Sequence, residues 1–369
     1  MRLGMFMMPV HPPARSFTET LAEDEEKALY ADQLGFDELW LGEHFSASSE
    51  PIPSPLMFMA SLLPRTKNLT FGTGVICLPN HDPVTVAAEV AQFDHMSRGR
   101  FMLGIGPGGL LSDFELFGNA DRGVRARKTM EAIATMQRIW AQDPPYDLPG
   151  EFRSVQLKEA IIPGLGIGFM PKPFQKSGPP VTMSVSSRNS PTARVAGQHG
   201  WGILSGNNMP ANAVATHWQS YSKACADTGR TARSDNWRVS RNIMVAPSDA
   251  EARDRVFSPQ GSNHYFYTYM REVLSRVGIL SVMKPDPNMP DDDATVDVIT
   301  EGCVLYGSPK TMLEKLVAFR DEVGPFGTLL MTGLDWSGPN RAWERDSMRL
   351  LAQEVMPKFR QHATAQAAE

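Results

Sequence analysis

The sequence contains little cysteine and no long apolar run. Its three cysteines, Cys77, Cys225 and Cys303, are odd in number and far apart among 369 residues, so they predict neither a disulfide framework nor a zinc ribbon. No stretch of about 18 apolar residues occurs that could span a bilayer, and the apolar start is too short for a secretory signal. These absences favour a protein of the reducing cytoplasm without a membrane anchor.

Charge and histidine spacing exclude further kinds of partner. Acidic residues (41) outnumber basic residues (36), for a net charge of −5, so the chain lacks the basic field that nucleic acids and anionic membrane surfaces require. The eight histidines include no HxH, HExxH or i, i+4 pair, so we expect no structural or catalytic metal. A small neutral molecule is the favoured ligand.

The sequence does contain a repeated alternation of short apolar runs and helical patterns. This alternation is typical of parallel strands connected by helices. We expect eight strands, at residues 3–8, 38–41, 69–77, 101–105, 181–187, 201–204, 239–246 and 328–332. The pattern predicts an α/β fold, a single (β/α)8 TIM barrel over residues 1–360, followed by a flexible C-terminal tail over residues 361–369.

Two irregular stretches interrupt the alternation. Residues 143–180, after the fourth strand and its helix, are rich in proline and glycine, and their length predicts a functional loop. Residues 257–300, after the seventh strand, contain Tyr265, Phe266, Tyr267 and Tyr269 and then an acidic, proline-rich segment. We therefore expect insertions after the fourth and seventh strands, the second of them lying over the site.

A glycine-rich motif follows the fourth predicted strand. Residues 104–109, GIGPGG, fit the GxGxxG pattern of dinucleotide-binding folds. Three βα units precede the motif, and the region about twenty residues further on is helical, where a Rossmann unit requires a strand. We therefore interpret these glycines as the end of a barrel strand, where they let the backbone approach a ligand or simply form a tight turn.

His44 directly follows the second predicted strand. Active sites of TIM barrels form at this end of the strands. A lone histidine is as readily structural as functional, so position alone leaves both roles open.

Two segments resemble the bacterial luciferase-like flavin-dependent monooxygenases. Residues 69–83, LTFGTGVICLPNHDP, resemble the third-strand signature of that superfamily, and residues 93–106 resemble its D-x-x-S-x-G-R-x-x-x-G-x-G pattern. Matches at residues 35–44, 307–309 and 354–357 extend the resemblance over nearly the whole chain. The segments GMF, HPP and GEH near the N-terminus are most similar to limonene-monooxygenase-like members.

The resemblance implies that the barrel binds reduced flavin at the carboxyl ends of its strands. The expected cofactor is reduced FMN, with FAD as the alternative. The cofactor-binding residues that it implies are Gly74, Val75, Gly106, Arg125, Arg188, Asn189, Ser190, Thr192 and Ser205. Among them, Gly74 and Val75 are expected to form a cis peptide bond against the flavin ring, and Arg125 is expected to bind the phosphate.

The phosphate assignment has structural alternatives. Arg125 could be a solvated helix arginine, and Ser190 could act only as a helix N-cap. Pro107 stands where luciferases have a second phosphate-binding arginine. This difference weakens the assignment and suggests that Arg188 compensates.

The resemblance also implies a reaction and its catalytic residues, His44 and Asp113. Reduced flavin and O2 would form a C4a-hydroperoxide that oxygenates a small, largely apolar organic substrate, with His44 supporting the peroxide or moving a proton. Phe45 replaces a second histidine of the luciferases, so light emission is not expected.

The expected partners follow from the same resemblance. No NADH-binding unit is visible, so a separate flavin reductase is expected, and we also expect a homodimer. Two other functions stay open on the same barrel: a deazaflavin-dependent oxidoreductase that transfers hydride, and a non-catalytic flavin-binding paralogue.

Overall fold

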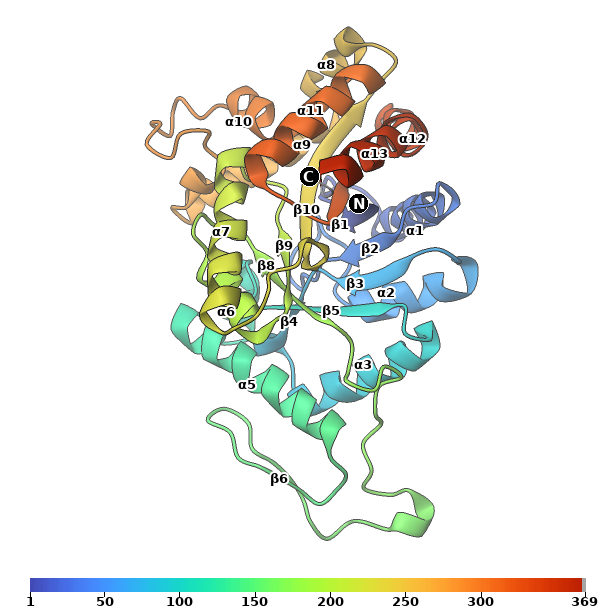
Figure 1. Ribbon diagram of the computed structural model, residues 1–369, viewed down its shortest axis with the longest axis vertical. Helices are drawn as coiled ribbons and strands as arrows, with labels where there is room; N and C mark the ends of the chain where they lie inside the picture. The colour runs from blue at the N-terminus through green and yellow to red at the C-terminus, as the bar shows by residue number, and fades with distance from the viewer. Residues whose placement is uncertain (367–369) are drawn as a thin grey trace.

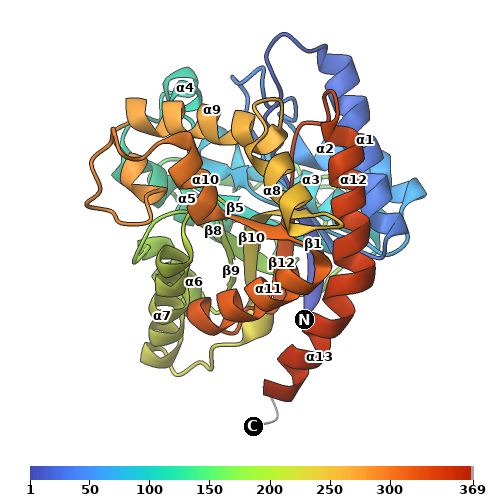
Figure 2. The ribbon, with the colours of Figure 1, turned by 90° about the horizontal axis from the view of Figure 1, so that it is seen from above.

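Eight parallel strands close into a barrel that helices surround (Figures 1 and 2). The computed structural model describes residues 1–366, with side chains described through residue 363. The barrel strands are β1 (Arg2–Met7), β2 (Glu38–Leu41), β3 (Thr70–Thr73), β5 (Phe101–Gly106), β8 (Val181–Val185), β9 (Gly202–Ser205), β10 (Trp237–Val245) and β12 (Thr328–Gly333). β1 pairs in parallel with both β2 and β12, which closes the ring. The predicted TIM barrel is confirmed.

Helices follow the strands and form the outer layer. Their bounds are α1 (Phe17–Gln33), α2 (Pro55–Leu62), α3 (Pro83–Ser97), α4 (Leu111–Leu116), α5 (Arg122–Ala141), α6 (Pro191–His199), α7 (Ala211–Asp227), α11 (Pro309–Val323), α12 (Asn340–Leu350) and α13 (Met356–Gln366). Ser16, Asp82, Asp121 and Ser308 cap α1, α3, α5 and α11 by accepting backbone N–H groups. These short polar side chains fix where each helix begins.

The barrel interior is filled with side chains at its amino-terminal end. Parallel strands covered by helices are buried on both faces, and β10 is buried at all nine positions. Arg238 Nε lies 2.9 Å from Glu38 Oε2, and Trp40 Nε1 donates to the same carboxylate at 2.8 Å. Phe6 and Leu330 pack with Trp40 in the interior. Ligand chemistry is therefore confined to the carboxyl end of the strands.

The third expected strand, residues 69–77, is divided in the structure. β3 ends at Thr73, and the short β4 (Ile76–Cys77) resumes pairing with β5. The Gly74–Val75 peptide bond between them is cis, as the resemblance implied.

The first insertion, between α5 and β8, lies outside the barrel (Figure 1). It contains an antiparallel hairpin of β6 (Tyr146–Leu148) and β7 (Val155–Leu157), which periodicity did not predict. Glu131 of α5 accepts the backbone N–H groups of residues 151–153, and Asp94 of α3 accepts that of Gln175. Because these contacts are with the outer helices, we leave this insertion out of the candidate site.

The expectation of an irregular stretch over residues 257–300 was wrong for residues 262–276 and 296–300, which are helical, while residues 277–295 contain only a short 3-10 turn. The segment from α8 to the end of the insertion holds α8 (Asp249–Phe257), α9 (Ser262–Arg276), α10 (Val296–Cys303) and β11 (Val304–Gly307). The aromatic residues that suggested a loop belong to α9, where Phe266 and Tyr267 are buried in a second apolar cluster. β11, also unexpected, pairs in parallel with the end of β10.

The C-terminal residues continue as a helix beyond the expected barrel end. α12 passes through a π-helical turn, Leu351–Val355, into α13, which reaches Gln366. Phe359 and Ala363, one helical turn apart, are both buried in the core, so residues 361–366 are not the expected tail. Residues 367–369 of that tail lie outside the described residues. No described helix is long and apolar enough to cross a membrane.

Candidate active site

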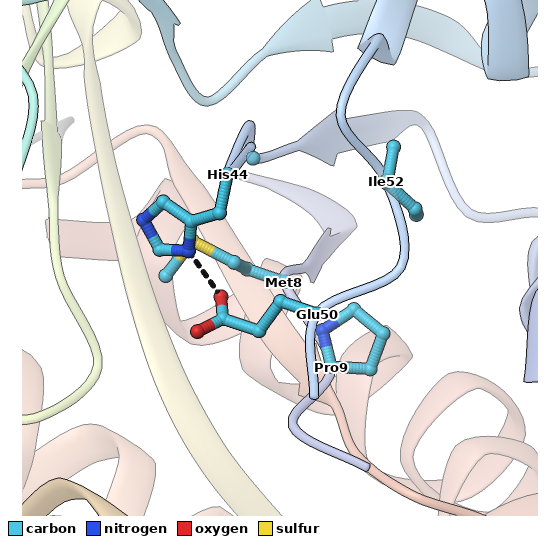
Figure 3. A pocket seen from close by; sticks show the side chains of 6 residues that line it. Met8, Pro9, His44, Glu50 and Ile52 are labelled. Carbon is cyan, nitrogen blue, oxygen red and sulfur yellow. Dashed lines mark hydrogen bonds and ion pairs between the residues drawn. The ribbon is translucent and has the colours of Figure 1, made fainter. Parts of the chain in front are cut away.

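His44 lies at the carboxyl end of the barrel, three residues after β2 ends at Leu41. A cavity of about 10 Å³ adjoins its ring, room for about one water molecule. Figure 3 shows Met8, Pro9 and Ile52 around this cavity, with Glu50 beside the imidazole. The position that the sequence indicated for His44 is therefore the barrel mouth.

Glu50 holds one nitrogen of the His44 ring. Its Oε2 lies 2.6 Å from His44 Nδ1 (Figure 3), and its other oxygen accepts a hydrogen bond from the Tyr269 hydroxyl at 3.3 Å. A carboxylate can only accept, so Nδ1 carries the proton. Within the described residues Nε2 has no hydrogen-bond partner, which leaves it available to a ligand.

Acidic neighbours favour the protonated form of His44. Burial lowers the pKa of its imidazole, but the charges of Glu50, Asp113 and Glu43, with the hydrogen bond to Glu50, raise that pKa above its usual value. The imidazolium therefore persists to higher pH than in a free histidine.

Asp113, expected to be catalytic, contacts the loop that follows His44. Its carboxylate accepts the backbone N–H of Phe45 at 3.2 Å and of Ser46 at 2.9 Å, and also the Ser46 hydroxyl. Asp113 is buried in α4. The structure thus brings the two expected catalytic residues together, but Asp113 acts on the backbone and holds the loop in place.

Glu43, which sequence reasoning missed, is tied to the third strand region. It accepts the Cys77 N–H at 3.1 Å, and both of its oxygens lie 3.0 Å from His81 Nε2. The carboxylates of Glu43, Glu50 and Asp113 thus fix the loop on both sides of His44.

The glycines of the GxGxxG motif are explained mainly by close packing. A Cβ on Gly104 would lie 1.7 Å from the Thr73 carbonyl oxygen, and a Cβ on Gly106 would lie 2.9 Å from Val75 Cγ2. Gly108 has a φ of +85° and forms the turn after β5. Gly106 therefore lets the β5 backbone approach Val75, at the place where the resemblance puts the flavin ring.

Arg125 is a buried cation in the first turn of α5. Its guanidinium stacks 3.5 Å above the Phe114 ring, and Nη1 donates to the carbonyls of Asn119 and Ala120, both at 2.7 Å. Nε is buried with no hydrogen-bond partner, and among the described residues Arg125 forms no ion pair. Burial, and to a lesser degree the charge of Arg122, lower its pKa. The Asp121 charge acts in the opposite direction but forms no ion pair with Arg125. A buried cation without an ion-pair partner among the described residues fits an anionic ligand such as a phosphate.

The segment before α6 offers further polar groups. Arg188 donates through Nη2 to Asn212 at 2.6 Å, while its Nε is buried without a partner. Asn189 has a positive φ of 49°. The Ser190 hydroxyl accepts the Thr192 N–H, so it caps α6 as the structural alternative expected.

The Ser205 hydroxyl is already engaged inside the protein. It lies 2.8 Å from His217 Nδ1 and accepts from Trp237 Nε1 at 2.9 Å, and it is fully buried. The proposed cofactor site leaves it out.

A second group of charged side chains lies between α1 and the loop after β12. His11 Nδ1 is 2.7 Å from Asp335 and Nε2 is 3.1 Å from Asp24. Although His11, Glu23 and Asp24 are close enough to share a cation, both nitrogens of His11 already bond carboxylates, and Arg15 and Lys27 pair with the same acids. We interpret this group as an ion-pair network.

Comparisons with known proteins agree with this geometry. A family model described as luciferase-like monooxygenase matches residues 1–324. The chain is 32% identical to 4-hydroxyprotoasukamycin monooxygenase of Streptomyces nodosus subsp. asukaensis, covering 96% of this chain and 91% of that protein. It is 31% identical to limonene 1,2-monooxygenase of Rhodococcus erythropolis, covering 96% and 86%.

A solved structure extends the comparison to a bound cofactor. The oxygenating constituent of 3,6-diketocamphane monooxygenase from Pseudomonas putida, a type II Baeyer-Villiger monooxygenase in complex with FMN, superposes with a TM-score of 0.87. The two are 27% identical, and the match covers 97% of this chain and 98% of that one.

Proposed function

This chain belongs to the luciferase-like monooxygenase family, and we propose that it is the oxygenase component of a two-component flavin-dependent monooxygenase. The observation that carries the proposal is the His44–Glu50 pair at the barrel mouth, which fixes one imidazole nitrogen beside the cavity and leaves the other without a hydrogen-bond partner among the described residues. Such a group can hold or donate a proton where a ligand binds.

The residues present fit a flavin mononucleotide. The buried guanidinium of Arg125, whose Nε has no hydrogen-bond partner, would bind the phosphate, together with the segment of Arg188, Asn189, Ser190 and Thr192 at the start of α6. Arg125 lies in the first turn of α5, which follows β5, and the segment 188–192 leads into α6, which follows β8. β5 and β8 are adjacent in the barrel, so the two groups belong to neighbouring βα units. Gly74, Val75 and Gly106 would border the ring. When bound and reduced, the flavin supplies the activation of O2. We propose reduced FMN as the cofactor, with FAD as the alternative.

The chain's own contribution to the reaction is a proton at a fixed atom. The Nδ1–H group of His44 donates a hydrogen bond to Glu50. The proton that the reaction would use is therefore the one on Nε2 of the imidazolium. The acidic neighbours raise the pKa of His44, which favours the imidazolium form, in which Nε2 also carries a proton. Asp113 holds the adjoining backbone of Phe45 and Ser46, so the imidazole is positioned before any ligand arrives.

We propose a small, largely apolar organic molecule as substrate. Met8, Pro9 and Ile52 give the cavity beside His44 an apolar wall, and relatives are named for limonene and for 3,6-diketocamphane. The choice among epoxidation, hydroxylation and Baeyer-Villiger oxidation is left to experiment. A solved relative is called an oxygenating constituent, which supports a separate flavin reductase as partner.

The assembly and location expected from the sequence stay proposals. Exposed apolar side chains of the first insertion, Leu165 and Ile167 among them, would be covered in a homodimer. Sedimentation of the purified chain would test that state. A cytoplasmic location agrees with three free cysteines.

One experiment separates the candidate functions. The purified chain is combined with a generic flavin reductase, NADH, FMN and ¹⁸O2, and tested on a panel of terpenes, cyclic ketones and amines. We expect a product that carries one ¹⁸O atom, and anaerobic titration in which reduced FMN binds more tightly than oxidised FMN. Hydride transfer from a reduced deazaflavin without oxygen incorporation would support the oxidoreductase instead. Tighter binding of oxidised FMN with no product would indicate a flavin-binding paralogue.

A further inference from the structure

Helix α9 of the second insertion reaches the residue that holds His44. The Tyr269 hydroxyl donates to Glu50 Oε1 at 3.3 Å, and the opposite oxygen of the same carboxylate lies 2.6 Å from His44 Nδ1. Ser49 also donates to the Tyr269 hydroxyl, at 3.4 Å. One carboxylate therefore links helix α9, whose Tyr269 is 219 positions further along the chain, to the imidazole at the barrel mouth.

Glu50 is held in place before any ligand binds. Its backbone N–H donates to Ala47 at 3.0 Å, and its carbonyl accepts the Ile52 N–H at 2.9 Å. The neighbouring Ser49 carbonyl accepts the His11 N–H at 2.7 Å, which ties this loop to the loop after β1. With 6% of the side chain exposed, the carboxylate has little water to compete for its two hydrogen bonds.

α9 is itself anchored to the barrel by polar contacts. Asn242, buried near the end of β10, donates to Asn263 of α9 at 3.1 Å, and the backbone N–H of Ser262 donates to Asn340 at 2.9 Å. Tyr265 donates to the His11 carbonyl at 3.4 Å. The helix thus contacts the loops after β1 and β2 and the start of α12. A shift of α9 would move Tyr269 relative to Glu50.

We propose that Glu50 and Tyr269 are positioning residues, through which α9 fixes the orientation and the proton affinity of His44. This inference rests on the proposed function for the role of His44 in oxygenation. Its structural part, the control of the imidazole by Glu50, stands on the contacts alone.

Among the charged groups around the His44 ring, Glu50 has the largest effect on the imidazole. Glu43 and Glu50 belong to the same loop after β2 as His44, and Asp113 belongs to α4. Tyr269 of α9 contacts Glu50. Asp113 bonds the Ser46 backbone and Glu43 bonds His81. Of the three carboxylates, only Glu50 therefore acts on His44 by both charge and direct contact. Burial and the charge of Glu50 raise the pKa of Tyr269 to about 12, so its hydroxyl stays a donor.

The first test reads His44 directly and needs no turnover. The protonation and tautomer of His44 are followed by NMR titration of the side-chain signals in the full chain, assigned with a His44→Gln variant. We expect Glu50→Gln to lower the pKa of His44 by about one unit or more and to lose the preference for the Nδ1-protonated neutral form. Glu50→Asp, which keeps the charge, should restore part of the shift.

Glu43→Gln is the matched control, because it removes a buried carboxylate beside His44 that makes no hydrogen bond to it. It should move the pKa of His44 by less than half as much. Equal shifts in the two variants, or an unchanged pKa in Glu50→Gln, would overturn the role of Glu50. Thermal melting checks that each variant is folded. Tyr269 is half-buried, and Tyr269→Phe removes its hydroxyl while keeping its aromatic ring.

The second test asks whether Tyr269 acts through Glu50. In a double-mutant cycle on product formed per O2 consumed, Tyr269→Phe should lower the ratio about two- to tenfold, the range of one hydrogen bond. In the Glu50→Gln background, Tyr269→Phe should cause no further decrease in product formed per O2 consumed. Effects that multiply would show that Tyr269 acts independently and would refute the link. If the wild-type chain formed no product, the proposed function would fail, whereas the titration of His44 would still decide the role of Glu50.

Discussion

Replacing Arg125 with alanine tests where the flavin phosphate binds. Arg125 is 8% exposed, carries no carboxylate partner among the described residues and has a buried, unbonded Nε. A charge-assisted bond from it to a phosphate contributes roughly 1.5–3 kcal/mol, which corresponds to a rise in Kd for FMN of about 10- to 150-fold. The two bonds from Nη1 to backbone carbonyls are lost as well, so the variant should also be about 1–2 kcal/mol less stable.

The assay compares FMN with riboflavin, which has the same ring but no phosphate. Arg125→Ala should weaken FMN binding and leave riboflavin binding nearly unchanged, measured by fluorescence titration well below the unfolding transition. Arg127→Ala is the control, because Arg127 lies two residues further along the same helix, is exposed and pairs with Glu151. Equal losses for FMN and riboflavin, or equal effects of the two substitutions, would refute Arg125 as the phosphate ligand.

Two further substitutions test the site and the fold around it. His44→Ala should bind FMN normally but oxygenate about 10²- to 10⁴-fold more slowly, with H2O2 released instead; a wild-type ratio of product to O2 consumed would make His44 structural. Glu344→Gln should change how the free energy of unfolding depends on pH. Burial raises the pKa of Glu344 from 4.5 to about 7, so the native state favours the neutral carboxyl. The wild-type protein therefore loses stability as pH rises through about 7. Urea unfolding should therefore find the variant more stable than wild type by up to about 3 kcal/mol at pH 8, with the advantage gone near pH 4.5; a difference independent of pH would contradict this.

The barrel could be predicted from the sequence because its strands are buried on both faces. Such strands appear as short continuous apolar runs separated by helical patterns, and all eight were expected close to where the structure has them. The hairpin β6–β7 was missed because its strands have three residues each and are partly exposed. The strand β11 was missed because it begins at the residue after α10, with no turn signal between them. α9 was mistaken for a loop because its aromatic residues, such as Tyr265 and Tyr269, suggested a cover over the site more strongly than a helix.

The site was predicted only where a residue sits at a fixed place relative to a strand or motif. His44 follows β2 directly, and Gly106 ends β5, so both could be located from the chain alone. Glu50 lies in an irregular loop, and its partner Tyr269 is 219 positions away along the chain. Their contact depends on how α9 docks on the barrel, which no local pattern encodes. Ser205 was assigned by resemblance, but tertiary packing gives its hydroxyl to His217 and Trp237.

The two ends of the barrel differ in how their buried charges are balanced, and that difference points to the site. At the amino-terminal end, Arg238 and Glu38 form a direct pair that Trp40 completes. At the carboxyl end, Arg125 forms no ion pair among the described residues and its Nε has no hydrogen-bond partner, with Asp121 the acidic group that acts on its charge. The carboxylates of Glu50, Asp113 and Glu43 lie around His44. An anion bound beside Arg125 would offset part of the cost of burying its charge, which is why we propose this residue as the phosphate ligand. The carboxylates around His44 would disfavour a second anion in the cavity, which supports our proposal of a neutral substrate beside the imidazole.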